Sequence, residues 1–317
     1  MKRSSLLHTL RHALSVTALV GLCSSLSAAT GEVTLSGSTW TGKVDGTTRY
    51  TGSNMSAAVN ACVANMSSGT INVRNSGNTG GRMSIKSNIT IDGTGKTFSG
   101  GGTLGVVYAQ NSSNIGAKNI KMQSSDWYGI YFRTCQTQNA TNNNGTANLS
   151  FRIDNCKGGN GSGLSIGNTW SDTSNSHGSH HVETYGQNGV TWGTITASDR
   201  TGGCGTLLNF SSNASGSTNN GWRDCIGCGY AGFRTANTNG KTTLGTAMSA
   251  TCGRGFFSVS GSRDCTISTV NIYNSSSHGI WLQTTYNTRV NGGTVRSSNP
   301  CTVITAGSGN SISVSCQ

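Results

Sequence analysis

The chain is poor in proline, in acidic residues and in long apolar segments. Its 317 residues include one proline and ten aspartates and glutamates, and only 10% of them are charged. A single proline excludes collagen and proline-rich linkers, and the low charge argues against an ordinary disordered chain. No apolar run beyond the N-terminus approaches the roughly 18 residues of a membrane span, so no transmembrane segment is expected.

Residues that suit turns are abundant instead. The chain contains 46 glycines together with many serines, threonines and asparagines, all of which are unfavourable inside helices. This composition excludes a long helical bundle and predicts an all-β protein with many turns.

Residues 1–29 have the pattern of a secretory signal peptide. Lys2, Arg3 and Arg11 form a basic start, Ala13–Leu22 is an apolar stretch too short to cross a bilayer, and Ser27–Ala29 supplies small residues for cleavage. Removing these three cations lowers the formal net charge from +12 to +9. We therefore expect a basic protein that is secreted, either to the extracellular space or to the periplasm.

Cysteine usage agrees with export. Ten of the eleven cysteines lie outside the signal segment, and an even number in an oxidising compartment predicts several disulfides. The sequence does not give their pairing. The spacing of Cys225 and Cys228 also suits a redox or zinc motif, but no second CxxC follows, so we favour disulfides.

One segment near the N-terminus has a helical pattern. Apolar residues recur every four positions within 53–68, and Gly69 follows as a stop signal. We predict an N-terminal segment over residues 30–69 whose α-helix caps the open end of a β-domain over residues 70–317.

The rest of the sequence repeats at intervals of about two dozen residues. Similar strands start at Gly205, Ala231, Gly255 and Gly279, so their spacing is nearly constant. Earlier copies start at Gly129 and Gly163, second strands at Leu149, Val190, Cys265 and Thr288, and third strands at Gly193, Ser268 and Gly292. Three short strands per unit predict a parallel β-helix, because propeller blades need about 40–50 residues and four strands.

Strand alternation identifies side chains that point away from the core. In the strand from His181 to Tyr185, Val182 points inward, so His181, Glu183 and Tyr185 share the outer face. Glu183 is one of two glutamates in the chain, and we interpret it as a general base or, preferably, as a partner that orients His181 or an arginine. Tyr185 is a candidate proton donor, with packing on the sheet as its structural alternative.

The same alternation places Tyr131, Arg234 and Trp281 on the outer face of other coils, so we expect them to form an aromatic and cationic groove next to the strand from His181 to Tyr185. Arg234 is a candidate partner for a substrate carboxylate, and the two aromatic rings are candidate platforms for sugar stacking. Packing between coils and surface ion pairing are the structural alternatives. His278 and Arg254 occupy equivalent corners one coil apart and are weaker substrate-binding candidates.

The scarcity of carboxylates bears on the reaction. Glycoside hydrolysis normally needs paired Asp or Glu, and the eight aspartates are scattered, with no Asp-Asp or Asp-x-Asp sequence. β-Elimination from a uronate polysaccharide needs a cation for the carboxylate, a base for the C5 proton and an acid for the leaving oxygen. His, Tyr, Arg and Lys fill these roles without metal, and a basic protein attracts an acidic polymer. The histidines between positions 177 and 181 lack a second ligand cluster, and no aspartate-rich calcium cluster is visible, so no metal site is predicted.

The coil pattern, the N-terminal helix and the leader resemble the pectin-lyase-like superfamily of right-handed parallel β-helices over roughly residues 50–317. Four stretches are similar to polysaccharide lyase family 31, an alginate lyase-like group: HVETYG at 181–186, GGCG at 202–205, GRGFFSVSG at 253–261 and SHGI at 277–280. The resemblance implies a metal-independent uronate lyase in which Tyr185 acts with a basic residue, His181 or Arg234. The sequence departs from polygalacturonases in lacking their paired aspartates and from common pectate lyases in lacking their Asp-rich calcium site.

We therefore expect a monomeric lyase that acts on an acidic polysaccharide such as alginate, with no cofactor and no nucleic-acid or membrane partner. The lack of a basic run or a known nucleic-acid motif argues against nucleic acid. Two alternatives stay open: a glycoside hydrolase that uses Glu183 with a distant aspartate, and a β-helix that binds carbohydrate without cleaving it.

Overall fold

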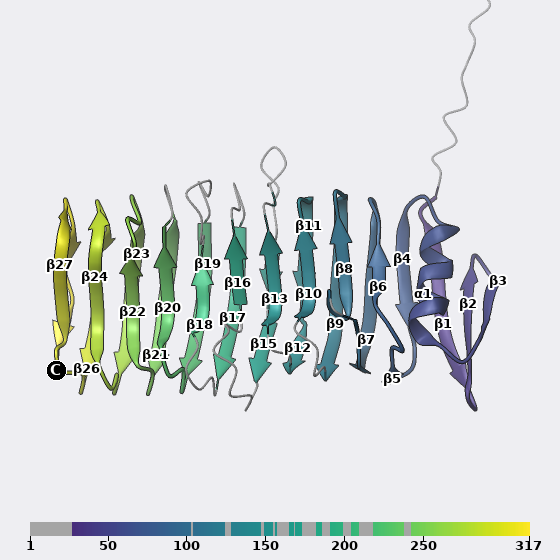
Figure 1. Ribbon diagram of the computed structural model, residues 1–317, viewed down its shortest axis with the longest axis horizontal. Coiled ribbons are helices and arrows are strands. Elements are labelled where there is room, and N and C mark those ends of the chain that lie inside the picture. Colours follow the sequence, from purple (N-terminus) through teal and green to yellow (C-terminus); the bar gives the residue numbers. More distant parts are fainter. Residues whose placement is uncertain are drawn as a thin grey trace, which may run out of the picture.

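The computed structural model shows a long stack of β-strands (Figure 1). Successive strands follow one another along the long axis, from the purple N-terminal end to the yellow C-terminal end. Within the described residues, the prediction of an all-β parallel solenoid is confirmed. The structure describes residues 27–102, 104–123, 128–146, 149–154, 156, 165–167, 169–172, 182–185, 191–198, 204–208, 218–237 and 242–317. The predicted signal peptide lies almost entirely outside this range and stays a prediction.

One sheet of the described chain has ten strands, and each pairs in parallel with the next coil's strand. We call it the front sheet. Its strands are β6 (Met83–Ile85), β8 (Val107–Gln110), β10 (Tyr128–Arg133), β13 (Leu149–Asp154), β16 (Val182–Tyr185), β18 (Cys204–Leu208), β20 (Ala231–Ala236), β22 (Arg254–Val259), β24 (His278–Tyr286) and β27 (Thr302–Ser308).

The remaining nineteen described strands form the second sheet, which we call the back sheet. Its pairings are parallel except in the N-terminal hairpins β1–β2 and β2–β3. The strands are β1 (Ala29–Ser36), β2 (Thr39–Val44), β3 (Thr47–Gly52), β4 (Gly69–Val73), β5 (Gly77–Asn78), β7 (Ile89–Ser99), β9 (Ser113–Gln123), β11 (Gln136–Thr141), β12 (Asn144–Thr146), β14 (Ser165–Gly167), β15 (Thr169–Asp172), β17 (Thr191–Ser198), β19 (Thr218–Ile226), β21 (Thr243–Ala250), β23 (Thr266–Tyr273), β25 (Arg289–Val290), β26 (Gly293–Arg296), β28 (Ser311–Ile312) and β29 (Ser315–Cys316).

The number of strands in a coil is not uniformly three. The strands predicted to start at Cys265 and Ser268 are one continuous strand, β23, so the coil that begins with β22 contains two strands. In the following coil β25 and β26 are separate strands, divided at Asn291 and Gly292. Neighbouring coils therefore differ in the number of strands they contain.

Two predicted strands belong to the other sheet. The segment at Leu149, predicted as a second strand of its coil, is β13 of the front sheet, and the segment at Gly163 contains β14 of the back sheet. The coils differ in length here, because the step along the chain from Tyr131 to its partner Arg152 is much shorter than the step from Arg152 to its next partner, Glu183. A fixed repeat length misplaces strands wherever a coil is this irregular.

Inward side chains form a continuous apolar ladder. The alternation predicted for Ile130, Phe132 and Val182 is confirmed, because all three are fully buried. Seven residues in register on the front sheet are at most 1% exposed: Val107, Ile130, Phe151, Val182, Phe233, Phe256 and Ile280. Each coil thus buries its apolar side chains only by stacking on its neighbours, which is the main stabilising term of such folds.

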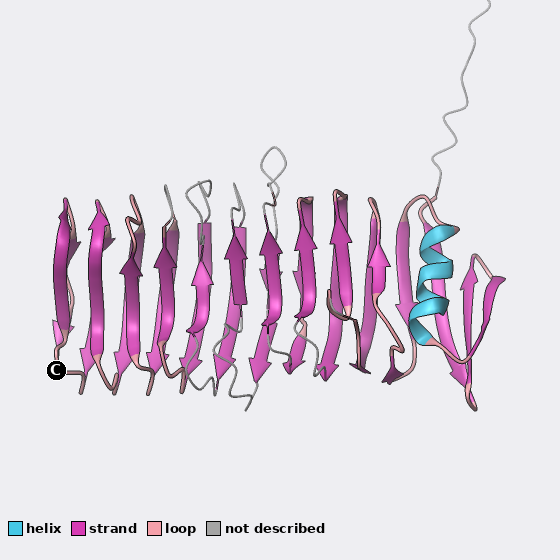
Figure 2. Ribbon diagram, in the orientation of Figure 1, coloured by secondary structure: helices cyan, strands magenta, loops and turns pink. Residues whose placement is uncertain are grey.

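The helix predicted within 53–68 is present as α1 (Met55–Ala64), drawn in cyan in Figure 2. The Asn54 side chain caps its N-terminus by accepting from the Ala57 N–H at 2.9 Å. The helix lies directly on β2, where a Cβ at Gly42 would stand 2.6 Å from the Ala58 carbonyl oxygen. Figure 1 places α1 beside β1 to β4 at the N-terminal end, and its capping role stays a prediction.

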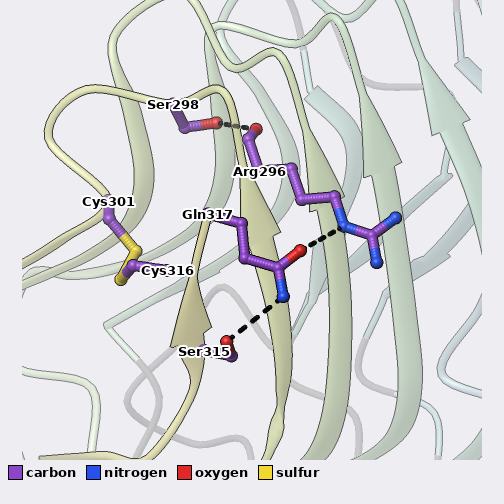
Figure 3. The surroundings of a disulfide bond; sticks show 6 residues. All are labelled: Arg296, Ser298, Cys301, Ser315, Cys316 and Gln317. Carbon is purple, nitrogen blue, oxygen red and sulfur yellow. Dashed lines mark hydrogen bonds between the residues drawn. A yellow bond between two sulfur atoms is a disulfide. The ribbon is translucent and has the colours of Figure 1, made fainter.

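The prediction of disulfides is confirmed for one pair of cysteines. The described residues contain one bridge, Cys301–Cys316, which ties the start of β27 to β29 with a Cα separation of 6.0 Å (Figure 3). Nearby, Arg296 Nε donates to Gln317 Oε1 at 2.9 Å. Six other cysteines are buried thiols: Cys62, Cys135, Cys156, Cys228, Cys252 and Cys265.

Candidate functional site

A single row of outward side chains runs along the front sheet. Its members pair residue by residue across adjacent strands, so the row follows the long axis of the molecule. They are Ser84, Tyr108, Tyr131, Arg152, Glu183, Arg234, Phe257, Trp281 and Val303, and on β18 the backbone of Leu207 continues the register between Glu183 and Arg234. We call this the outer row.

Four predicted site residues belong to the outer row: Tyr131, Glu183, Arg234 and Trp281. The structure thus brings together candidates that lie far apart in the sequence. Adjacent strands lie about 4.8 Å apart, so Glu183 and Arg234, two strands apart, have backbones separated by about 10 Å. Their roles in catalysis stay predictions.

The other predicted candidates flank the row. Arg254 and His278 pair with each other across β22 and β24, which confirms that they occupy equivalent corners. Tyr185 lies on β16 with its backbone paired to Asp154, and its side chain lies outside the description. His181 lies outside the described residues, so its predicted place beside Glu183 stays a prediction.

Aromatic rings gather at the N-terminal part of the row. We call Arg82, Tyr108, Tyr128 and Tyr131 the tyrosine cluster. The Tyr131 ring lies 5.5 Å from that of Tyr108 and 4.6 Å from that of Tyr128. The Arg82 guanidinium lies 4.7 Å above the Tyr108 ring, and its Nε donates to Ser84 Oγ at 3.0 Å. Because these neighbours cover it, Tyr131 is only 5% exposed and offers little open area for a sugar.

The middle of the row holds an ion pair. Arg152 Nη1 donates to Glu183 Oε1, and the two side chains are 18% and 12% exposed. From the sequence we prefer Glu183 as a partner that orients His181 or an arginine, and this contact agrees with the second of these two alternatives. A carboxylate whose ionised form is stabilised by an arginine is a weaker base than a free one, which suits positioning better than proton abstraction.

Cations and aromatic rings gather again at the C-terminal part of the row. We call Tyr230, Arg234, Arg254, Phe257, His278 and Trp281 the arginine cluster. The Arg254 guanidinium lies 4.7 Å from the Tyr230 ring centre, 4.8 Å from that of Phe257 and 5.1 Å from that of Trp281. The Arg234 guanidinium lies 5.1 Å from the Tyr230 ring.

The two arginines are held by ring faces. Among the described residues neither has a carboxylate partner, and the buried Nε atoms of both have no hydrogen-bond partner. Arg254 Nη1 donates to the Tyr230 carbonyl at 3.3 Å. Cation–π contacts fix the two guanidiniums without neutralising their charge, so the cluster presents positive charge to an anionic ligand.

His278 and Trp281 form the end of the arginine cluster. Their rings stack with centres 4.4 Å apart and planes inclined by 15°, and Trp281 also stacks on Phe257. Trp281 Nε1 donates to Thr305 Oγ1 at 3.1 Å, and Ser277 Oγ lies 2.6 Å from His278 Nδ1. Burial, followed by the positive charge of Arg254, lowers the pKa of His278 below its usual value. His278 is therefore a neutral imidazole at pH 7, able to accept a proton.

Sequence reasoning missed several members of the site. Arg152 was placed in the wrong sheet, and Tyr108 lies one coil before Gly129, the first repeat recognised in the sequence. Phe257 follows the inward Phe256, and because both residues are phenylalanine, only the alternation of the strand shows that Phe257 points outward. Arg82, Tyr128 and Tyr230 lie at strand ends, where alternation fixes no direction.

No group of three or more His, Cys, Asp or Glu side chains that could hold a metal occurs within the described part of the chain. In the same residues, no helix is long and apolar enough to cross a membrane.

Comparison with known proteins gives distant similarities in structure. No protein-family model and no curated protein sequence matches the chain. The A-module of the mannuronan C-5 epimerase AlgE6 from Azotobacter vinelandii matches 83% of this chain and 94% of its own, with 11% identity and a TM-score of 0.46. A GH87 α-1,3-glucanase from Streptomyces thermodiastaticus matches 81% of this chain and 66% of its own, with 12% identity and a TM-score of 0.45.

A third similar structure is the Dettilon tailspike protein, which matches 83% of this chain and 59% of its own, with 12% identity and a TM-score of 0.42. At these identities and TM-scores, none of the three likenesses assigns an activity to this chain.

Proposed function

We propose that the protein is a secreted polysaccharide lyase that cleaves an acidic, uronate-containing polysaccharide such as alginate by metal-independent β-elimination. The observation that carries the proposal is the outer row, which sets aromatic rings and uncompensated guanidiniums along one face of the solenoid. Aromatic faces suit sugar rings, and guanidiniums suit carboxylates.

The length of the row favours a polymeric substrate. Tyr131 and Trp281 lie on β10 and β24, six strand spacings apart, which corresponds to about 29 Å. A single sugar cannot reach both clusters, whereas a chain that runs along the axis can. The positive charge of the whole protein adds long-range attraction for an acidic chain.

The residues of the row and its flanks divide the tasks of β-elimination. In our proposal Arg234 and Arg254 bind substrate carboxylates and stabilise the charge that develops when the C5 proton leaves. Tyr185 and His181 act as the proton donor and acceptor, as the family resemblance implies. Glu183 holds Arg152 in place and does not take part in proton transfer.

The first experiment incubates the mature protein with acidic and neutral polysaccharides, with and without a chelator. We expect an unsaturated, ultraviolet-absorbing product from an acidic polymer, unchanged by the chelator. Tyr185→Phe keeps the ring but removes the phenolic proton and should lower the rate by about 10²–10⁴-fold. A fully active Y185F protein would remove Tyr185 from the mechanism.

One observation favours a second candidate function, glycoside hydrolysis. Glu183 and Asp154 lie at diagonal positions on adjacent strands, because Glu183 pairs with Arg152 and Asp154 follows Arg152 by two residues. Their backbones are about 8 Å apart, a spacing compatible with paired catalytic carboxyls. New reducing ends without unsaturation would identify hydrolysis, and binding without any product would identify a non-catalytic carbohydrate-binding protein.

A further inference from the structure

Two cysteines lie in register on consecutive coils next to the tyrosine cluster. Arg133 of β10 pairs with Asp154 of β13, and Cys135 and Cys156 each follow their strand by two residues. The backbone N–H of Cys135 donates to Cys156 Sγ at 3.3 Å. Both side chains are at most 1% exposed, so neither sulfur faces solvent.

A second pair repeats this arrangement on the other edge of the solenoid. Ile226 of β19 pairs with Ala250 of β21, and Cys228 and Cys252 again follow by two residues. The backbone N–H of Cys228 donates to Cys252 Sγ, also at 3.3 Å. The same contact therefore occurs twice, once in the turn after the front sheet and once in the turn after the back sheet.

The geometry of both pairs suits a covalent bond. In-register positions on adjacent coils are about 4.8 Å apart, within the Cα separation of about 4.4–6.8 Å found in disulfides. The two thiols of each pair also interact. Hydrogen bonding from Cys228 is the largest cause that lowers the pKa of Cys252, to about 7, and Cys156 lowers the pKa of Cys135 in the same way.

The hydrogen bond alone does not require sulfur. Further along the second turn, the N–H of Ser275 donates to Ser298 Oγ at 2.9 Å, which is the same contact made with a hydroxyl group. In the first turn Ser112 precedes Cys135 in the ladder, because Ser113 pairs with Gln136. Serine thus fills these positions in neighbouring coils, and the pairing of two cysteines needs another explanation.

We propose that Cys135–Cys156 and Cys228–Cys252 are two further disulfide sites, each linking consecutive coils. One thiolate attacks a small-molecule disulfide such as oxidised glutathione and releases one thiol. The second thiolate then displaces the other half, so one S–S bond replaces another and both cysteine protons end on the released thiols. Because the folded chain buries all four residues, the exchange takes place while the coils are still stacking.

Each bond would tie together two coils that carry neighbouring site residues. Cys135–Cys156 joins the coils of Tyr131 and Arg152. Cys228 and Cys252 precede β20 and β22, the strands that carry Arg234 and Arg254. The inference is independent of the proposed lyase activity, because disulfide bonds are detected by mass spectrometry and not by an activity assay.

The test is a disulfide map. The full chain is unfolded in denaturant with reductant, refolded in a mixture of reduced and oxidised glutathione, alkylated and digested without reduction. We expect linked peptides for both pairs in addition to Cys301–Cys316. Cys62, on α1, and Cys265, whose in-register neighbours are Thr242 and Thr288, are internal controls that should be alkylated.

The matched variants are Cys156→Ser and Cys252→Ser, since serine already fills this ladder position elsewhere. Each variant should lose its own linked peptide and keep the other. Reduction should lower the Tm of the unsubstituted protein by about 5 °C or more for each of the three bonds, and in each variant this shift should be smaller by the share of one bond. A second measurement maps the disulfides of protein that an expression host has secreted, without any refolding step.

Three results would overturn the proposal. They are complete alkylation of the four cysteines in folded protein, glutathione adducts without linked peptides, and links to other partners such as Cys225 to Cys228. None of these results depends on whether the protein has lyase activity.

Discussion

The tyrosine cluster and the arginine cluster lie on the same face of the same sheet, and both place guanidiniums on aromatic rings. They differ in what else holds the cation. Arg82 has a hydroxyl partner in Ser84, and the neighbouring Arg152 has a carboxylate partner in Glu183. Arg234 and Arg254 lie against rings, with no carboxylate partner among the described residues.

This difference shows how one surface can combine structural and binding roles. Where cations are matched by oxygen partners and rings cover one another, the contacts stabilise the stack. Where cations keep their charge and the indole remains partly open, the same residue types are suited to an anionic sugar chain. Four predictions test this division, in order of decreasing effect.

The largest contrast is between Tyr131→Ala and Trp281→Ala. Tyr131 is 5% exposed, so removing its ring should lower the free energy of unfolding by about 3 kcal/mol. Trp281 is partly exposed, and its removal should cost less stability but weaken polysaccharide binding about tenfold. Urea unfolding and calorimetric binding measure the two effects. Equal losses of stability in both variants would contradict the division.

Glu183→Gln should destabilise the protein by about 2 kcal/mol, because it leaves a mostly buried Arg152 beside a neutral amide. The control is Glu32→Gln, which breaks the exposed Glu32–Arg74 pair, about half exposed on each side, and should change stability by less than about 0.5 kcal/mol. Denaturant unfolding measures the stability of both variants. A double-mutant cycle with Arg152→Met gives the interaction energy between Arg152 and Glu183. A Glu183→Gln protein as stable as its control would show that the pair is not structural.

Arg254→Ala should weaken binding of an acidic polysaccharide about 10- to 30-fold and leave binding of a neutral one unchanged. The matched control is Arg263→Ala, because Arg263 makes the same kind of contact, 4.7 Å above the Tyr286 ring, outside the outer row. The salt dependence of binding should fall only in the Arg254 variant. Parallel losses for neutral and acidic chains would argue for lost packing instead of lost charge.

The smallest effect concerns pH. The pKa of His278 is lowered in the folded protein, so between the unfolded value near 6.5 and the lower folded value only the unfolded chain binds the proton. Stability contributed by the neutral ring is therefore complete above about pH 6.5 and is lost as the pH falls through that window. His278→Gln should flatten this dependence, and Arg254→Met should raise the imidazole pKa, measured by NMR titration. An unchanged pKa in Arg254→Met would remove Arg254 as a cause.

Much of the fold follows from local patterns. The alternation around Ile130 and Val182 gives the inward face correctly, and the apolar period of 53–68 finds α1. The coil boundaries between residues 149 and 183 cannot be predicted from local patterns. Coil lengths vary there, and no local signal marks which sheet a short strand joins. The even cysteine count predicted disulfides, but it contains no information on register and therefore does not give their pairing.

The sequence predicted members of the candidate site and a groove that they share, but not the contacts between them. Alternation alone showed that Tyr131, Glu183, Arg234 and Trp281 point outward, because side-chain direction on a strand is a property of two neighbouring peptides. That they share one row, that Tyr131 is covered, and that Glu183 meets Arg152 depend on the pairing of distant coils. Pairing is fixed by the stacking of whole turns, whose lengths differ, so only the tertiary structure decides which outward residues become neighbours.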